Sequence, residues 1–176
     1  MIHLPTLEPL TAGAAIAFLP FALGIGAWVA WSDMKFMKIP NKTMIALLAV
    51  WLVVGLGAVG LTGLSLVSWA WGWAFAAIVL VIGFLANALR LVGGGDAKFA
   101  TAMAPFFVGA DWRTVFVLAA SCLIGAFVAH RLARSIGAIR RATPDWVSWT
   151  SRDFPMGLAL AGTLIFHLLL TIQGAF

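Results

Sequence analysis

The chain has 176 residues, of which 63% are hydrophobic and only 10% are charged. A soluble domain is about one quarter charged, so this composition excludes a soluble protein and predicts an integral membrane protein. The apolar runs exceed the about ten alternating residues of a membrane β-strand, and helices satisfy their own backbone groups in lipid. We therefore expect an all-α membrane protein that forms a single domain over residues 1–176.

Six hydrophobic segments follow one another along the chain. They cover residues 12–31, 43–61, 66–89, 97–110, 114–132 and 156–172. A spanning helix needs about 20 residues, so the fourth segment is short for a crossing. The pattern predicts six transmembrane helices, with residues 133–155 forming a basic loop in the cytoplasm or on the inner leaflet.

The basic residues are distributed unevenly between the connections. Ten of the eleven lie in or beside the connections that follow the first, third and fifth segments, and Arg113 is the exception. The positive-inside rule places these three connections in the cytoplasm and both termini outside. This distribution indicates orientation and contact with anionic lipid headgroups, and no nucleic-acid partner. The first ten residues lack a basic region, so no secretory signal peptide is expected.

Two of the six acidic residues, Asp33 and Asp96, lie at the cytoplasmic ends of hydrophobic segments. Acids at membrane depth are costly and usually functional. Two carboxylates that share one proton can activate water and protonate a scissile carbonyl. The pair predicts an aspartyl protease at the edge of the bilayer, without metal or cofactor. The other acids lie on the outer side or among the arginines of the 133–155 loop, where solvated ion pairs are expected: Glu8, Asp111, Asp145 and Asp153.

Three glycines, Gly93 to Gly95, directly precede Asp96. Glycine lets backbone approach backbone, so we expect an extended substrate to lie beside Asp96. Asp96 is also expected to open a helix, where free N–H groups and the helix dipole favour an anion. The simpler alternatives are that Asp96 is only an N-cap and that Asp33 pairs with a loop lysine. Neither alternative accounts for the glycines.

Four further polar residues lie within or beside the apolar segments. Cys122 is the only cysteine, which excludes an intrachain disulfide and a cysteine-cluster zinc site. Asn87 is expected to bond across helices or to the glycine loop. His130 and His167 are each expected to make one hydrogen bond between helices, with a proton relay as the alternative.

Three short motifs resemble the signatures of the type IV prepilin peptidase family, and they occur in the family's order. The first is an aspartate followed by a basic-Ile-Pro-Asn step, the second is GxGDxK, and the third is Pro-x-Gly-x-Ala at the start of the last helix. The residues that carry them are Asp33 with Lys38, Ile39, Pro40 and Asn41; Gly93, Gly94, Gly95, Asp96 and Lys98; and Pro155 and Gly157.

The resemblance implies a membrane-embedded aspartyl endopeptidase of the bacterial cytoplasmic membrane. Such enzymes remove the short basic leader of prepilins or pseudopilins on the cytoplasmic side. Asp33 and Asp96 map onto the catalytic pair, and the other motif residues map onto substrate-binding or supporting positions. The implied partners are a prepilin, with its leader and apolar helix, and membrane lipids; the oligomeric state is not indicated.

One departure from the larger family members concerns the N-terminus. Those members carry a four-cysteine cytoplasmic insertion, which is not present before the first hydrophobic segment here. The chain therefore resembles the compact peptidases of Flp/Tad-type pilus systems, and N-methyltransferase activity is not expected.

Two other functions remain open at this point. A lipoprotein signal peptidase also uses two aspartates, but near the outer face, whereas the charge distribution places Asp33 and Asp96 inside. A small transporter or channel subunit would use these acids as ion or proton sites, and it predicts acids within helices near the midplane.

Overall fold

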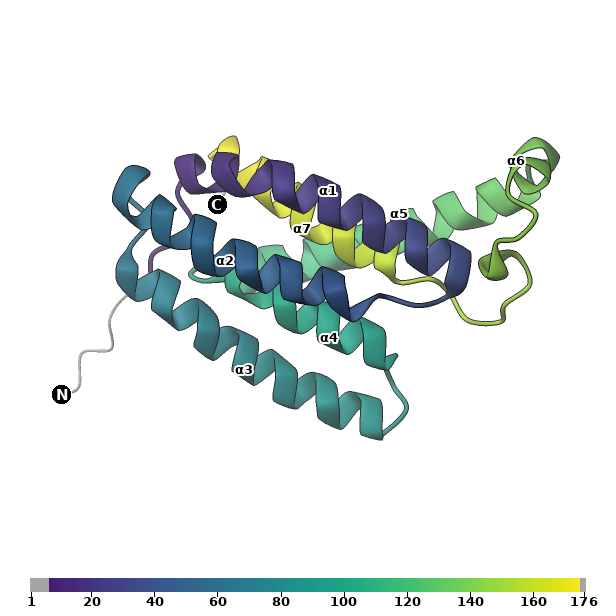
Figure 1. Cartoon of the computed structure of the whole chain (residues 1–176), viewed down its shortest axis with the longest axis horizontal. Helices are drawn as coiled ribbons and strands as arrows, with labels where there is room; N and C mark the ends of the chain where they lie inside the picture. The colour runs from purple at the N-terminus through teal and green to yellow at the C-terminus, as the bar shows by residue number, and fades with distance from the viewer. Residues whose placement is uncertain (1–6, 175–176) are drawn as a thin grey trace.

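A computed structural model describes residues 7–174, which form helices joined by short connections (Figure 1). The elements in chain order are α1 (Ala12–Phe36), α2 (Asn41–Leu61), α3 (Leu66–Ala88), α4 (Gly94–Met103), the 3₁₀ helix η1 (Ala104–Phe107), α5 (Trp112–Ser135), α6 (Gly137–Ala142), the 3₁₀ helix η2 (Val147–Trp149) and α7 (Gly157–Ile172). The described residues contain no β-strand, which confirms the all-α prediction. The prediction that no signal peptide is present falls largely on residues 1–6, outside the described residues.

Four helices, α1, α2, α3 and α5, are long and apolar enough to cross a membrane. Helix α7 is apolar but has 16 residues, and α4 has ten. At 1.5 Å per residue, a helix as short as α4 covers only about half of a hydrocarbon core of about 30 Å. The chain is thus a multi-pass membrane protein. The count of six spans is not confirmed, and the orientation stays a prediction.

The fourth predicted segment, 97–110, forms a short buried element. Helix α4 starts earlier than predicted, at Gly94, and passes into η1, where Pro105 stands near the first position. Proline lacks the N–H that a continuing α-helix requires, which accounts for the change in helix type. Phe99 and Phe106 are fully buried. The element is therefore both short and largely buried among the other helices.

The α1–α2, α3–α4 and α5–α7 connections all lie at one end of the bundle, on the right of Figure 1. The bounds of the helices at this end differ from the prediction. Helix α1 continues to Phe36, so Asp33 and Lys35 lie within its last turns, and α2 begins at Asn41, so Lys42 is also helical. The basic residues of the first connection are thus largely carried by helix ends.

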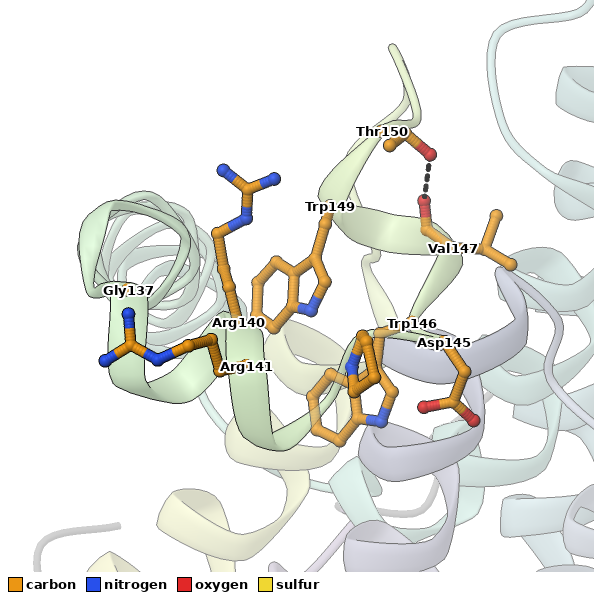
Figure 2. Close-up of a pocket in the computed structure, with 9 residues that line it drawn as sticks. Gly137, Arg140, Arg141, Asp145, Trp146, Val147, Trp149 and Thr150 are labelled. Carbon is orange, nitrogen blue, oxygen red and sulfur yellow. Dashed lines mark hydrogen bonds between the residues drawn. The ribbon is translucent and has the colours of Figure 1, made fainter.

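The predicted loop 133–155 is folded against the end of α5. It contains α6 and η2, and Trp149 of η2 is buried, with its Nε1 donating to the Thr143 carbonyl oxygen at 2.9 Å. Trp146 stacks on one face of Trp149, with ring centroids 5.4 Å apart (Figure 2). His130 of α5 stacks on Trp149 at 5.5 Å. Aromatic contacts therefore position this region, which the sequence indicated as a basic loop in the cytoplasm or on the inner leaflet.

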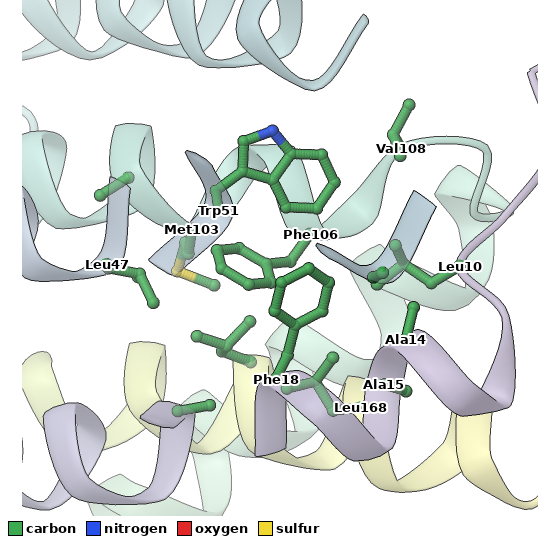
Figure 3. Close-up of a cluster of buried hydrophobic side chains, with 14 of the residues drawn as sticks. Leu10, Ala14, Ala15, Phe18, Leu47, Trp51, Met103, Phe106, Val108 and Leu168 are labelled. Carbon is green, nitrogen blue, oxygen red and sulfur yellow. The ribbon is translucent and has the colours of Figure 1, made fainter. Parts of the chain in front are cut away.

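Three aromatic rings join three elements at the centre of the core (Figure 3). Phe18 of α1 lies 4.9 Å from Phe106 of η1 and 5.5 Å from Trp51 of α2, between ring centroids. Trp51 and Phe106 are 5.2 Å apart. The pairs that include Phe106 are edge-on, an arrangement that the charge distribution of aromatic rings favours. This cluster fixes η1, and hence the buried end of α4, against α1 and α2.

Helices α2 and α3 pack through glycines that leave room for indole rings. A Cβ at Gly72 would lie 2.5 Å from the ring of Trp51, and one at Gly55 would lie 2.8 Å from the ring of Trp69. Trp69 Nε1 also donates to the Trp51 carbonyl oxygen at 3.0 Å. Each indole thus lies over a glycine of the facing helix, a form of the small-residue packing common between membrane helices.

We predict that Gly72→Ala lowers the stability of the protein, because the new methyl group overlaps the buried Trp51 ring. Overpacking of this kind costs about 1–3 kcal/mol, which thermal unfolding in detergent would report as a lower midpoint. Gly57→Ala is the matched control, since nothing lies within 4 Å of a Cβ at Gly57. Equal midpoints for the two variants would contradict this account of α2–α3 packing.

Candidate active site

Asp33 joins the end of α1 to the start of α7. It lies in the last turn of α1 and is only 5% exposed. Its Oδ2 accepts a hydrogen bond of 2.7 Å from the backbone N–H of Gly157, the first residue of α7. The first N–H groups of a helix have no partner within that helix, so the carboxylate satisfies one of them. The simpler alternative, an ion pair between Asp33 and a loop lysine, is not observed among the described residues.

Only glycine fits at position 157 while its backbone N–H bonds to Asp33, because any side chain would collide with Asp33. A Cβ at Gly157 would lie 2.8 Å from Asp33 Cβ and 3.1 Å from both Asp33 Oδ2 and a Val29 methyl carbon. The predicted Pro-x-Gly-x-Ala motif thus has a structural role at its glycine. Pro155, two residues earlier, is buried in the connection that leads into α7.

Asp96 stands in the first turn of α4, and Gly93, not Asp96, is the N-cap residue. The expectation that Asp96 opens a helix is confirmed, since it stands in the first turn, where the helix dipole favours a carboxylate. The simpler alternative, that Asp96 is only an N-cap, is wrong. Helix α4 is outside the four spanning helices. Burial, together with the smaller effect of the nearby negative charge of Asp33, raises the pKa of Asp96 to about 6.

The two acids line one cavity of about 570 Å³ at the end of the bundle where the three basic connections lie. The sequence predicted that both carboxylates face the same side, and the structure brings them to the same cavity. The remaining lining residues come from the ends of α1 and α3 and from the connections before α4 and α7: Met37, Asn87, Arg90, Leu91, Val92, Gly93, Asp153, Phe154 and Met156.

The motif residues after Asp33 attach the α1–α2 connection to its neighbours. Ser32 Oγ donates to the Lys38 carbonyl oxygen at 2.8 Å. Ile39 packs on Gly95, where a Cβ would lie 3.3 Å from Ile39 Cβ. The connection that follows one acid is thus in contact with the helix that carries the other.

A second link between the two motifs is a hydrogen bond between side chains. Lys98 Nζ donates to Asn41 Oδ1 at 3.3 Å. Asn41 begins α2, and Pro40 stands at its N-cap position with extended backbone. The sequence assigned no role to Lys98, and in the structure it ties the start of α2 to the first turns of α4.

The three glycines before Asp96 do not form an open extended strip. Gly94 and Gly95 are helical and pack on Asn87 and Ile39. That an extended substrate lies beside Asp96 stays a prediction. Gly93 does line the cavity. A Cβ there would lie 2.6 Å from Asp96 Oδ2, so glycine at this position leaves space for the carboxylate.

The connection between α3 and α4 is held in an unusual backbone conformation. Asn87 Nδ2 donates to the Val92 carbonyl oxygen at 2.9 Å, which confirms the predicted bond from Asn87 to the glycine loop. Arg90 has φ of 59° and Met37, after α1, has φ of 53°; these are the non-glycine residues with positive φ among residues 7–174. Both line the cavity, and such conformations concentrate at functional sites.

The histidines and the cysteine lie away from the two acids. His167 Nε2 is 2.9 Å from the Phe106 carbonyl oxygen, which confirms a bond between α7 and η1. His130 is buried and stacks on Trp149, and Cys122 is a half-buried free thiol on α5. Within residues 7–174, no three His, Cys, Asp or Glu side chains gather where they could hold a metal ion.

Sequence reasoning missed the part of the cavity that comes from the end of the 133–155 loop. Asp153 was expected to form a solvated ion pair among the arginines, yet the one ion pair among the described residues joins Lys35 and Asp145, at 2.8 Å. Asp153 lines the cavity with Phe154 instead. The only signal available was its position, two residues before Pro155 of the third motif.

These features define a multi-pass helical membrane protein with two carboxylates in one cavity at an end of the bundle. A sequence model of the type IV leader peptidase family matches residues 20–130, a stretch that includes Asp33, Asp96 and the motif residues around them. The chain belongs to this family and is a membrane peptidase. No curated protein and no solved structure matches it.

We predict that Gly157→Ala reduces peptidase activity by at least about tenfold, because a Cβ 2.8 Å from Asp33 Cβ displaces the carboxylate or the start of α7. Gly162→Ala is the control, since a Cβ on the same helix would make only an ordinary contact of 3.7 Å with Cys122 Sγ. The measurement is cleavage rate per folded protein, with the folded fraction taken from gel filtration. Full activity in Gly157→Ala would contradict this account, because it would show that catalysis does not depend on the close contact between Asp33 and residue 157.

Proposed function

We propose that the chain is an aspartyl endopeptidase in which Asp33 and Asp96 are the catalytic pair. The observation that carries the proposal is that both carboxylates line one cavity, with the charge of one acting on the other. The family match supports a peptidase, and the match covers both residues. The two acids come from different motifs that are separated by two membrane-spanning helices.

The proposed reaction is hydrolysis of a peptide bond by water. One ionised carboxylate takes a proton from the water as its oxygen attacks the scissile carbonyl carbon, and the protonated carboxylate donates to the carbonyl oxygen. When the tetrahedral intermediate collapses, the C–N bond breaks and the leaving amine takes the proton that the first carboxylate removed from water. The hydroxyl formed from the carbonyl oxygen returns its proton to the second carboxylate, which restores the pair. Like charges in one cavity hold a single proton between them over a range of pH, so the pair is in the required state without a further group.

The proposed substrate is a prepilin or pseudopilin whose basic leader enters the cavity from the cytoplasm. The cavity wall contains three carboxylates and a single arginine, Arg90, so its charge is complementary to a basic peptide. The concentration of lysine and arginine at this end of the bundle supports the cytoplasmic orientation. The resemblance of the three motifs supports the prepilin, and its apolar helix is proposed to lie in the membrane beside the bundle.

The subfamily and location are proposed on the sequence alone. The motifs resemble those of the compact Flp/Tad-type peptidases, and this resemblance supports a bacterial cytoplasmic membrane as the location and pilus assembly as the process. The described chain offers no cysteine cluster of the kind that larger members carry, so the proposal includes cleavage without N-methylation.

Neither alternative function is favoured by a specific observation. A transporter site predicts acids near the middle of spanning helices, whereas Asp33 lies three residues before the end of α1 and Asp96 lies in the first turn of α4. The lipoprotein signal peptidase alternative is not favoured, because the matching family model is that of the type IV leader peptidases.

We predict that Asp33→Asn and Asp96→Asn each reduce cleavage of a co-expressed Flp-type prepilin by a factor of at least about 10³, since neither variant can hold the shared proton in the required way. Cleavage is read from the mobility of the pilin on a gel. Asp111→Asn is the control, because Asp111 caps α5 by accepting from Thr114 N–H, and asparagine caps equally well. Cleavage at the normal rate by either active-site variant would remove that residue from the catalytic pair.

We predict a bell-shaped pH profile for kcat/KM, with an alkaline limb that begins near the Asp96 pKa of about 6. Above this pKa the pair loses its last proton and no carboxyl group can donate to the carbonyl oxygen, so activity falls as pH rises. Below the lower pKa of the pair both groups are protonated and no base remains, so activity falls again; these values belong to the pair jointly. A profile that stays flat to pH 8, with stability checked by return to pH 6, would contradict a shared proton.

Asp153 is predicted to act on the recognition of a basic leader and not on the chemical step. Asp153→Asn should raise KM by up to about fivefold for a leader with lysines, since an exposed ion pair contributes at most about 1 kcal/mol. KM for the same leader with glutamines should be unchanged, as should kcat for both. Equal KM changes for the two leaders would rule out charge recognition by Asp153.

A further inference from the structure

A second cavity, of about 720 Å³, lies between α6 and η2 and is separate in its lining from the cavity of the two acids. Arg140 and Arg141 of α6 form one side, and Trp146 and Trp149 form the other (Figure 2). Asp145 lies at the edge nearest α1. The peptidase function proposed above uses none of these residues.

The charge of this cavity is positive at its arginine side. Arg140 and Arg141 are exposed, and the single ion pair among the described residues is that of Lys35 and Asp145. Asp145 does not neutralise the arginines, because its carboxylate is paired with Lys35 Nζ at 2.8 Å. This contact lowers the pKa of Asp145. Two guanidinium groups are thus left without a carboxylate partner within the described structure.

The tryptophans give the cavity a rigid apolar wall. Their rings are stacked at 5.4 Å with an angle of 13° between the planes. Trp149 is buried, stacks on both Trp146 and His130, and donates its Nε1 to the Thr143 carbonyl oxygen. It therefore holds Trp146 in place and offers no free donor to a ligand. Val147, which lines the cavity, is 46% exposed, and Ile136, directly before the lining residue Gly137, is 47% exposed. A ligand here meets positive charge on one side and apolar surface on the other.

The position of the cavity along the membrane normal follows from α5. This spanning helix ends at Ser135, and α6 begins at Gly137. Figure 1 shows α6 just beyond the end of α5, at the same end as the other basic connections. The cavity therefore lies at the level of the headgroups, where tryptophan and arginine are both favoured.

We propose that this cavity binds the phosphate headgroup of an anionic phospholipid from the adjacent leaflet. An arginine guanidinium matches phosphate oxygens with paired hydrogen bonds. The exposed Val147 and Ile136 suit the glycerol and upper acyl region, which a free phosphate lacks. The lipid thereby ties the 136–150 region to the membrane, and this region in turn contacts α1 through Lys35, two residues from Asp33.

The test is titration of the purified full chain with phosphatidylglycerol and with phosphatidylcholine of the same acyl chains, read by native mass spectrometry. Each basic residue near an anionic headgroup strengthens binding about fivefold. Arg140→Gln with Arg141→Gln should therefore weaken phosphatidylglycerol binding by about 25-fold and leave phosphatidylcholine binding unchanged. The double lysine variant keeps the charge but loses the paired hydrogen bonds, so its affinity should fall between those of the wild type and the double glutamine variant. The measurement does not depend on cleavage, so it stands or falls independently of the proposed peptidase function.

Arg113→Gln is the matched control, because Arg113 lies 5.3 Å from the Trp112 ring centre at the opposite end of α5. It should keep wild-type affinity. The proposal is overturned if wild-type protein retains both lipids equally or if Arg113→Gln matches the double glutamine variant. Displacement of the lipid by millimolar inorganic phosphate would also overturn it, since the cavity would then be a site for free phosphate. Circular dichroism of the exposed-arginine variants excludes unfolding as the cause.

Discussion

The hydrogen bond between the Asp33 carboxylate and the Gly157 N–H connects the two ends of the chain's membrane domain. It spans 124 positions in sequence at a distance of 2.7 Å. A buried carboxylate without such a donor would be strongly unfavourable, and a helix start without an acceptor would leave an N–H unsatisfied. The hydrogen bond satisfies both groups. It requires α1 and α7 to approach so closely that position 157 has no room for a side chain. Small residues farther along the same pair, Gly26 and Ala161, keep the two helices close.

The second acid depends on a short helix that is enclosed by longer ones. Helix α4 is anchored at its far end by Phe106 in the aromatic cluster and at its near end by the contacts of Gly95 and Lys98. Asp96 therefore reaches the cavity from a different element than Asp33 does. Because these anchors also involve the α1–α2 connection, the two motifs support each other: the residues that follow Asp33 hold the helix of Asp96. The proposed pairing of acids is a consequence of this packing.

Much of the candidate site could be predicted from the sequence. Asp33 and Asp96 stand out because acids are expensive in an apolar chain, and the basic residues indicate that both face one side. The enclosure of α4 was not predictable, because a ten-residue helix is recognisable as buried only when its neighbours are placed. The contribution of Asp153 was hidden for the same reason. It lies in a polar loop that is held in place by tertiary contacts, among them the stacking of Trp149 on His130 and the ion pair of Asp145 with Lys35. The role of Gly157 as the close contact of Asp33 could not be predicted either, because it depends on the packing of α1 against α7, which no local sequence pattern indicates.

The central claim is that Asp33 and Asp96 face each other across one cavity. It is tested most directly by cross-linking Asp33→Cys with Asp96→Cys in a Cys122→Ser background, which removes the only native cysteine. Membrane-embedded protein is treated with a short bifunctional thiol reagent and digested between the two positions. The account predicts that the Asp33→Cys/Asp96→Cys chain remains joined after digestion, whereas an Asp33→Cys/Asp111→Cys chain, with cysteines at opposite ends of the bundle, separates. Separation of both chains, with both cysteines shown to be reactive, would contradict the account.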